Sequence, residues 1–126
     1  MTTQEVADKL VALCRKGDYD QAIQELYSPD IVSVEPEGVP DRIVKGIDGV
    51  IAKGEKFEST LERVNKSIIS DPIVAGNHFS CSMLMNVQFK GAPMAVDMDE
   101  VCVYTVREGK IIREEFFYTQ APIGAV

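Results

Sequence analysis

Between His78 and Lys90 the chain alternates between apolar and polar residues almost without interruption. The residues of one parity form an apolar set, Phe79, Cys81, Met83, Met85, Val87 and Phe89. A period of two residues is that of a β-strand, because successive side chains of a strand point to opposite faces. The segment therefore predicts a long strand that packs one face on a core and turns the other toward water.

Two more extended segments follow this strand. Residues 94–106 and 111–119 are again rich in apolar and β-branched residues, and turns that contain Gly91 and Gly109 separate the three segments. Short glycine-containing turns favour antiparallel hairpins. The C-terminal half therefore predicts an antiparallel meander.

The N-terminal half shows helical periodicity instead. Residues 2–17 carry apolar side chains at helical spacing, and Thr2 and Glu5 have the spacing of a capping box. Residues 18–27 and residues 46 to about 64 predict a second and a third helix in the same way.

Two further strands are expected, near residues 31–35 and 66–70. The chain has 126 residues, which suits one hydrophobic core and a single domain over residues 1–126. Three helices followed by a meandering sheet predict the α+β class, with the helices packed on one face of a mostly antiparallel sheet.

The charge of the chain excludes several kinds of partner. The formal net charge is −7 and the pI is about 4.7. Binding to a nucleic-acid backbone or to an anionic membrane requires clustered lysine and arginine, so we expect neither. The N-terminus lacks the pattern of a secretory signal, and no apolar run is long enough to span a bilayer. We therefore expect a cytoplasmic protein.

The residues with metal or redox chemistry do not form a motif. Cys14, Cys81 and Cys102 lack CxxC spacing, so we expect three reduced, buried thiols. The single histidine, His78, has no partner at ligand spacing. Asp97 and the neighbouring Asp99 are too few for a hard cation. We expect neither a metal site nor a cofactor.

The turns predict which strand residues lie opposite one another. Across the first hairpin the predicted pairs are Phe89–Met94, Met83–Glu100 and Cys81–Cys102. Across the second they are Val106–Ile111, Tyr104–Arg113, Cys102–Glu115 and Glu100–Phe117. This register places Glu100, Glu115 and Arg113 on the apolar face and Glu114, Phe116 and Tyr118 on the opposite face. A bulge in either hairpin would exchange some of these assignments.

Two acids stand out against this apolar pattern. Glu35 ends the first strand directly before Pro36, either because the chain leaves the core there or because the carboxylate faces a cavity. Glu100 is flanked by methionines on the apolar face, where an acid is costly unless it is paired or protonated. It either pairs with Arg113 or a helix group, lies near a wet sheet edge, or lines a cavity with Glu35 and has a raised pKa.

The order of these motifs resembles that of a known superfamily. A helix, GDYD at 17–20, a second helix, LYSPDIVSVEP at 26–36, a third helix and strands that end in GKIIREEFFY at 109–118 resemble the nuclear transport factor 2-like superfamily. Within it the chain is most similar to the SnoaL-like and ketosteroid-isomerase-like branch. The resemblance implies a cystatin-like cone in which a curved sheet wraps around helices and leaves a deep apolar pocket. It also implies a homodimer that packs through the outer face of the sheet.

The resemblance also implies roles for residues. Glu35 before Pro36 matches the acid that serves ketosteroid isomerases as general base. Glu100 is the acid nearest to the position that donates a hydrogen bond to the oxyanion in those enzymes. Leu10 occupies the place of their tyrosine, and Tyr104 is the tyrosine that could reach the same cavity from the sheet. These departures argue against steroid isomerisation and leave a pocket with one or two carboxylates.

We therefore predict an isomerase, cyclase or hydrolase that acts on a small, largely apolar carbonyl compound. Glu35, Glu100 and Tyr104 are the predicted catalytic residues. The predicted ligand-binding residues are Phe79, Met83, Met98, Cys102, Glu115 and Phe117. Two alternatives remain: a non-catalytic module that binds a lipid-like or metabolite ligand, favoured by an open pocket with ordinary carboxylates, and an accessory module that dimerises or docks, favoured by a pocket filled with its own side chains.

Overall fold

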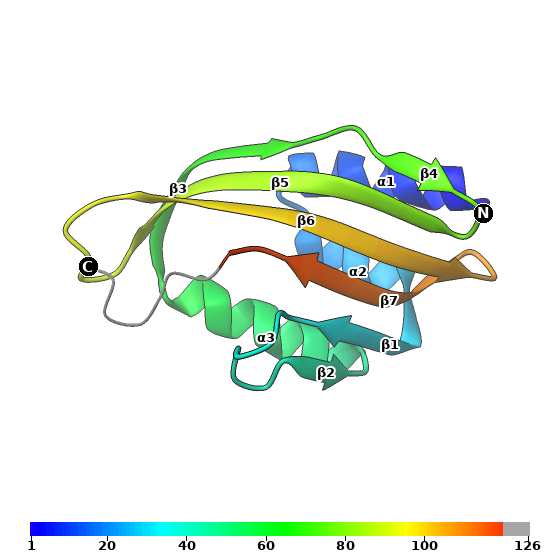
Figure 1. Cartoon of the computed structure of the whole chain (residues 1–126), viewed down its shortest axis with the longest axis horizontal. Helices are drawn as coiled ribbons and strands as arrows, with labels where there is room; N and C mark the ends of the chain where they lie inside the picture. Colours follow the sequence, from blue (N-terminus) through cyan, green and yellow to red (C-terminus); the bar gives the residue numbers. More distant parts are fainter. Residues whose placement is uncertain (120–126) are drawn as a thin grey trace.

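The computed structural model describes residues 1–119 and shows helices packed against a curved, open sheet (Figure 1). Within these residues the helices are α1 (Thr3–Arg15), α2 (Tyr19–Leu26) and α3 (Ile47–Ser59). The strands are β1 (Tyr27–Val34), β2 (Ile43–Lys45), β3 (Leu61–Ile69), β4 (Ile73–Ala75), β5 (His78–Phe89), β6 (Val96–Arg107) and β7 (Lys110–Phe117). The predicted α+β class is confirmed.

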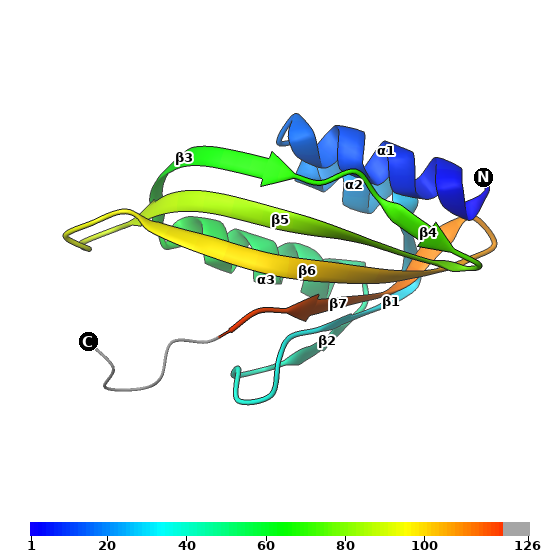
Figure 2. The ribbon, with the colours of Figure 1, turned by 45° about the horizontal axis from the view of Figure 1, so that its top comes forward.

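The sheet has the strand order β2-β1-β7-β6-β5-β3, and β4 adds to β5 beside β3. All of its pairs are antiparallel in the described chain except β1 with β7, which run parallel. Figure 2 shows the helices on one side of the sheet, α1 and α2 over one end and α3 across the other. The parallel pair brings the end of β1, which leads to Glu35, beside the last strand of the chain.

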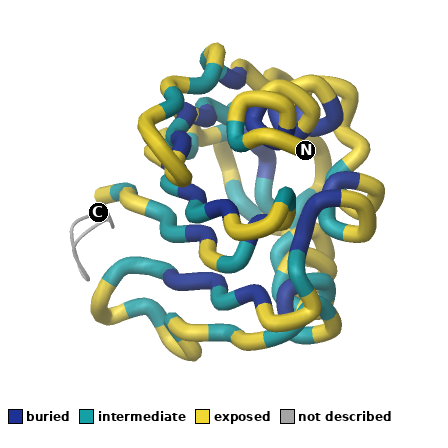
Figure 3. Tube along the Cα trace, turned by 90° about the vertical axis from the view of Figure 1, so that its right-hand side faces the viewer, coloured by how far each residue is buried: buried dark blue, intermediate teal, exposed yellow. Residues whose placement is uncertain are grey.

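The helices form where the apolar periodicity predicts them. In α1 the hydroxyl of Thr2 accepts from the backbone N–H of Glu5, and the Glu5 carboxylate accepts from that of Thr2, so the capping box is present. Figure 3 shows the buried residues gathered where helices and sheet face each other. Their centre includes Leu10, Leu26 and Ile111, and Tyr104 stacks on Phe79 with 4.7 Å between ring centroids.

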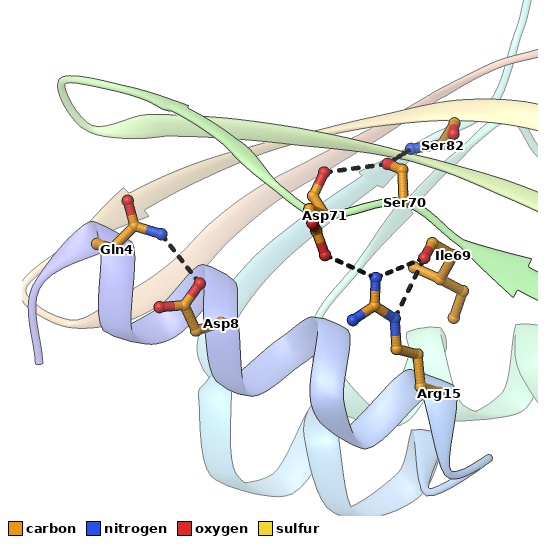
Figure 4. Close-up of polar contacts among 7 residues, drawn as sticks. All are labelled: Gln4, Asp8, Arg15, Ile69, Ser70, Asp71 and Ser82. Carbon is orange, nitrogen blue, oxygen red and sulfur yellow. Dashed lines mark hydrogen bonds and ion pairs between the residues drawn. The ribbon is translucent and has the colours of Figure 1, made fainter.

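Hydrogen bonds and an ion pair attach the C-terminal end of α1 to the sheet. Arg15 donates from Nη2 to the backbone oxygen of Ile69 at 2.7 Å and to Oδ1 of Asp71 at 2.9 Å (Figure 4). Ser70 sits between these two partners, and its hydroxyl accepts from the backbone N–H of Ser82 at 2.8 Å. These bonds satisfy backbone groups where β3 leaves the sheet and hold α1 across it.

The third helix is shorter than predicted. It ends at Ser59, and Leu61, which lies within the predicted helix of residues 46 to about 64, begins β3 instead. The hydroxyls of Ser59 and Thr60 donate to the backbone oxygens of Lys56 and Phe57, each at 2.6 Å. Such local bonds compete with the continuation of a helix. The short strands β2 and β4 were not predicted, because three residues give too little periodicity to recognise.

The register of the first long hairpin is confirmed. Met83 lies opposite Glu100, and Cys81 lies opposite Cys102. In the second hairpin Val106 pairs with Ile111 as predicted, but Thr105 then pairs with Arg113. Ile112 is therefore an extra residue in β7, a bulge that shifts every later pair by one position.

This bulge reverses the faces predicted for β7. Glu114 and Phe116 lie opposite Tyr104 and Cys102, on the face under the helices. The prediction that Glu115 and Phe117 face inward is wrong, because Glu115 pairs with Arg113 on the outer face and Phe117 is 51% exposed. A one-residue slip has this effect because side chains alternate along a strand.

Candidate functional site

The end of β1 carries polar side chains into the interior. Ile31 and Ser33 are fully buried on the helix-covered face, and Glu35 continues their parity just after the strand. The Glu35 side chain is 16% exposed. The carboxylate that ends this strand therefore faces inward, which decides between the two interpretations of its position in favour of an interior group.

Lys53 of α3 is the cation that meets this carboxylate. Its Nζ donates to Ser33 Oγ at 2.7 Å and to Glu35 Oε2 at 2.9 Å. The same ammonium lies 5.0 Å from the centre of the Phe116 ring, a cation–π distance. The Lys53 side chain is 28% exposed, so the ion pair with Glu35 is partly screened from water and stronger than a surface pair.

Glu114 forms the inner end of the same hydrogen-bonded chain. The residue is 3% exposed. Ser33 donates to its Oε2 at 2.7 Å, and the Tyr27 hydroxyl donates to its Oε1. Burial raises the pKa of Glu114, and the hydrogen bonds from Tyr27 and Ser33 act in the opposite direction. Burial is also the largest cause of the raised pKa of Tyr27, followed by the charge of Glu114.

Tyr118 completes the chain at its outer end. Its hydroxyl donates to Glu35 Oε1 at 2.7 Å. Burial and this hydrogen bond raise the pKa of Tyr118. We call the six linked residues the carboxylate network: Tyr27, Ser33, Glu35, Lys53, Glu114 and Tyr118. At its outer end a hollow of about 330 Å³ is lined by Pro36, Phe117, Tyr118 and Thr119.

Glu100 of β6 shares this interior without a cation of its own in the described structure. Burial, and then the negative charge of Glu35, raise the pKa of Glu100 from 4.5 to about 7, and Glu114 adds to the shift. The Cys102 thiol and Lys53 act in the opposite direction. The thiol sulfur of Cys102 lies 3.6 Å from Glu100 Oε1 as a weak donor. Glu100 is thus a carboxyl group that holds a proton up to near-neutral pH.

The structure excludes one of the alternatives left open for Glu100. Arg113 is not its partner, because Arg113 donates to Glu115 Oε1 at 3.1 Å on the outer face. The interior groups that act on the pKa of Glu100 are instead Glu35, Glu114 and Lys53. Glu35 and Glu100, which lie far apart in the sequence, therefore share one electrostatic environment.

The remaining predicted site residues fall into three groups. Phe79, Met83 and Cys102 are buried on the inner face, and Met98, opposite Met85, is half-buried there. Tyr104 is 2% exposed and stacked on Phe79, so its ring belongs to the core. Glu115 and Phe117 lie on the outer face, as described above.

Lys53 was not predicted as a site residue, and Glu114 and Tyr118 were predicted on the wrong face. A signal for Lys53 was present: it follows Val50 by three residues and precedes Phe57 by four, so it interrupts the apolar stripe of α3. Ser33 likewise breaks an apolar strand. No comparable signal marked Glu114, because its orientation depends on the bulge at Ile112.

The described residues hold no cluster of histidine, cysteine, aspartate and glutamate suited to a metal ion. Cys14, Cys81 and Cys102 are free and buried, as predicted. No helix in the described part of the chain is long and apolar enough to cross a membrane.

Comparison with known proteins identifies relatives over nearly the whole chain. A family model described as the SnoaL-like domain matches residues 1–118. A solved structure from Mesorhizobium loti, described as a candidate SnoaL-like polyketide cyclase and also as a carbohydrate phosphatase, is 30% identical. The match covers 94% of this chain and 100% of that chain, with a TM-score of 0.88. A comparison with curated proteins found no match.

More distant structures share the fold. TerC, co-crystallised with polyporic acid, is 20% identical with a TM-score of 0.75, over 94% of this chain and 92% of that one. A Catenulispora acidiphila protein with a ketosteroid isomerase-like fold, in complex with trimethylamine, is 18% identical with a TM-score of 0.72. That match covers 90% of this chain and 85% of the other.

The raised pKa of Glu100 predicts a specific pH dependence of stability. The folded protein keeps the proton up to about pH 7, whereas the unfolded chain loses it near 4.5, so stability falls as the pH rises between these values. Relative to wild type, Glu100→Gln should gain up to about 3 kcal/mol in free energy of unfolding between pH 4.5 and 8. Urea denaturation at several pH values measures this difference. Glu115→Gln, on the outer face, is the matched control, and an equal pH dependence in both variants would refute the assignment.

The bridge from Lys53 predicts strong coupling with Glu35. Lys53→Met leaves Glu35 mostly buried without its cation, so it should cost more stability than Lys53→Met made in a Glu35→Gln background. A double-mutant cycle should give a coupling energy of about 1–3 kcal/mol. Denaturant unfolding of the four proteins at pH 7.5 measures it. Additive effects of the two substitutions would show that the pair contributes no more than a surface salt bridge.

Proposed function

The chain belongs to the SnoaL-like domain family of the nuclear transport factor 2-like superfamily, and we propose that it is an enzyme that moves a proton next to a carbonyl group. The substrate is a small, largely apolar carbonyl compound, and the reaction is of the isomerase or cyclase kind. Its relatives support this class: the Mesorhizobium loti protein is described as a candidate polyketide cyclase, and TerC was crystallised with polyporic acid.

The observation that carries the proposal is the unequal environment of two neighbouring carboxyl groups. Glu35 has its charge compensated by Lys53 at 2.9 Å and receives a hydrogen bond from Tyr118. Glu100 is desolvated beside that negative charge, and its pKa is raised to about 7. Two acids whose environments separate their protonation states form an acid–base pair.

Each acid then has a defined role. Glu35, as the carboxylate, takes a proton from the carbon beside the carbonyl group. Glu100, as the neutral acid, donates a hydrogen bond or a proton to the carbonyl oxygen, where negative charge develops. Lys53 and Tyr118 hold the Glu35 carboxylate in place through their hydrogen bonds. Both bonds must weaken before the carboxylate can take a proton from the substrate. Proton transfer of this kind needs no cofactor.

The lining of the inner face suits such a substrate. Met83 of β5 lies opposite Glu100, and Met98 and Cys102 lie two residues before and after Glu100 on β6. Apolar and polarisable side chains keep water away from a carboxyl group and adapt to the shape of an apolar ligand. We assign Tyr104 to packing rather than to catalysis, because its ring is stacked within the core.

A second function, binding without catalysis, is favoured by one observation. Both oxygens of Glu35 are engaged by side chains, Oε2 by Lys53 and Oε1 by Tyr118. A carboxylate saturated in this way can serve as a structural anchor for Lys53. The two functions differ in whether substitution of Glu35 removes turnover.

Isotope exchange provides the test. The protein is incubated in D₂O at pH 7 with a panel of small cyclic and unsaturated ketones that exchange slowly in buffer, and deuterium uptake is followed by NMR. We expect uptake above the buffer rate for at least one ketone, with losses of about 100-fold or more in Glu35→Gln and in Glu100→Gln. Glu115→Gln should retain the wild-type rate. Equal uptake by wild type and Glu35→Gln would reject the catalytic role.

We also propose that the chain forms a homodimer through the outer face of its sheet. This face exposes apolar residues on four neighbouring strands: Ile68 lies opposite Leu84, and Val101 lies opposite Phe117, with Ser82 and Asp99 between the two pairs. Ile68, Val101 and Phe117 are 48%, 47% and 51% exposed. Exposed apolar groups on neighbouring strands are typical of a protein–protein interface.

The dimer predicts a change of mass on substitution. Val101→Asp places a charge in the centre of the proposed interface and should give a monomer in sedimentation experiments at concentrations where wild type is a dimer. Met94→Asp is the control, because Met94 is 72% exposed but lies in the turn between β5 and β6, away from the paired strands. A monomeric wild type, or a dimer in both variants, would contradict the proposed interface.

A further inference from the structure

Arg42, which precedes β2, has a buried nitrogen without a partner. Among the side chains of residues 1–119, only the Nε of Arg42 is a buried nitrogen or oxygen atom without a hydrogen-bond partner. The Arg42 side chain as a whole is half-buried. A buried donor that makes no bond costs about 1–3 kcal/mol, so nearly all such groups in folded proteins have a partner. The unpartnered Nε–H of Arg42 therefore requires an explanation.

The backbone places Arg42 on the same face as Glu35. The N–H of Glu35 donates to the backbone oxygen of Arg42 at 2.7 Å, which extends the antiparallel β1–β2 ladder one pair beyond Val34 and Ile43. Directly opposite residues of a ladder project to the same side of the sheet. Arg42 therefore projects to the inner side, beside the proposed general base.

The packing of α3 brings this position close to Lys53. Val44, two residues after Arg42, contacts α3 so tightly that a Cβ on Gly49 would lie 2.8 Å from its Cγ1. From there α3 runs back along β2 (Figure 1). Lys53 is four residues beyond Gly49, about 6 Å along the helix, and Arg42 is two residues before Val44, a similar distance along the strand. Arg42, through its backbone oxygen, and Lys53, through its ammonium group, thus both contact Glu35 from adjacent elements.

The two cations differ in whether their hydrogen-bond donors already have partners. Lys53 already donates to Ser33 and Glu35. Among residues 1–119, no acid forms an ion pair with Arg42. The Nε–H and one terminal N–H of a guanidinium form a planar fork that matches a carboxylate. A phosphate dianion suits the position less well, because Glu35 and Glu114 already concentrate negative charge there.

We propose that Arg42 binds a carboxylate group of the ligand, so that the substrate is a carbonyl compound that also carries a carboxylate. This inference rests on the proposed function for the carbonyl group, whereas the carboxylate site stands on the unpartnered donor and its position. The hollow lined by Pro36, Phe117, Tyr118 and Thr119 lies beside Glu35, which accepts a hydrogen bond from Tyr118. Arg42 would orient the ligand, with its carbonyl end directed toward Glu35 and Glu100.

The test compares two probes of the same shape. Benzoate and benzamide are each titrated into the ¹⁵N-labelled protein at pH 7.5, and the Nε–H signal of Arg42 and the backbone signals of residues 33–45 are followed by NMR. We expect benzoate to shift these signals and to bind at least tenfold more tightly than benzamide. Arg42→Gln should weaken benzoate binding at least tenfold, while Arg107→Gln, an exposed arginine in β6, should leave it unchanged.

A second variant covers the case in which Arg42→Gln does not fold. Arg42→Lys keeps the charge but loses the planar fork, so it should also lower the preference for benzoate over benzamide. Equal binding of the two probes to wild type, unchanged benzoate binding in the Arg42 variants, or no binding of benzoate would overturn the proposal. The readout is binding without turnover, so it is separate from the isotope exchange: carboxylate binding without exchange rejects catalysis alone, and exchange without a carboxylate preference rejects the role of Arg42 alone.

Discussion

The ammonium group of Lys53 is the contact on which the arrangement of the interior depends. It joins α3 to β1 through Ser33 and Glu35, and through Ser33 it reaches Glu114 of β7. Among the described residues, three acids project into this region, Glu35, Glu100 and Glu114, and Lys53 is the cation that acts on the pKa of both Glu100 and Glu114. Burial, followed by the negative charge of Glu35, raises the pKa of Glu100, and Lys53 opposes this shift. The shared lysine and the low exposure of the acids together separate Glu100 from an ordinary glutamate.

The bulge at Ile112 decides which acids take part. Without it Glu115 and Phe117 would face the helices, and Glu114 would face outward. With it, Glu114 receives hydrogen bonds from Tyr27 and Ser33, and Tyr118 reaches Glu35. The same one-residue shift leaves Phe117 opposite Val101 on the outer face. A single unpaired residue therefore sets both the composition of the interior and that of the proposed dimer surface.

Much of the fold was predictable because it depends on local patterns. The alternation in β5 and β6, the capping box of α1 and the apolar stripe of its helix are properties of short segments, and each was found where predicted. The family resemblance agrees with the SnoaL-like match over residues 1–118. For the same reason Glu100 was assigned to the correct face of its strand, whereas the direction of Glu35, just after β1, was left open. Glu115 and Phe117 were misassigned because the parity of β7 is set by how the chain leaves a turn, not by its own residues.

By itself the sequence determined the secondary structure class, the placement of Glu100 on the apolar face, and the three free cysteines. Hydrophobic periodicity carries this information, because a strand or helix must turn its apolar side to a core. The tertiary structure alone decided which charges meet. Lys53, Glu114 and Glu35 are separated by many residues, and their pairing requires the parallel contact of β1 with β7 and the return of α3 across β1. Electrostatic neighbours depend on distance in space, which a single sequence does not record when the contacts are long-range.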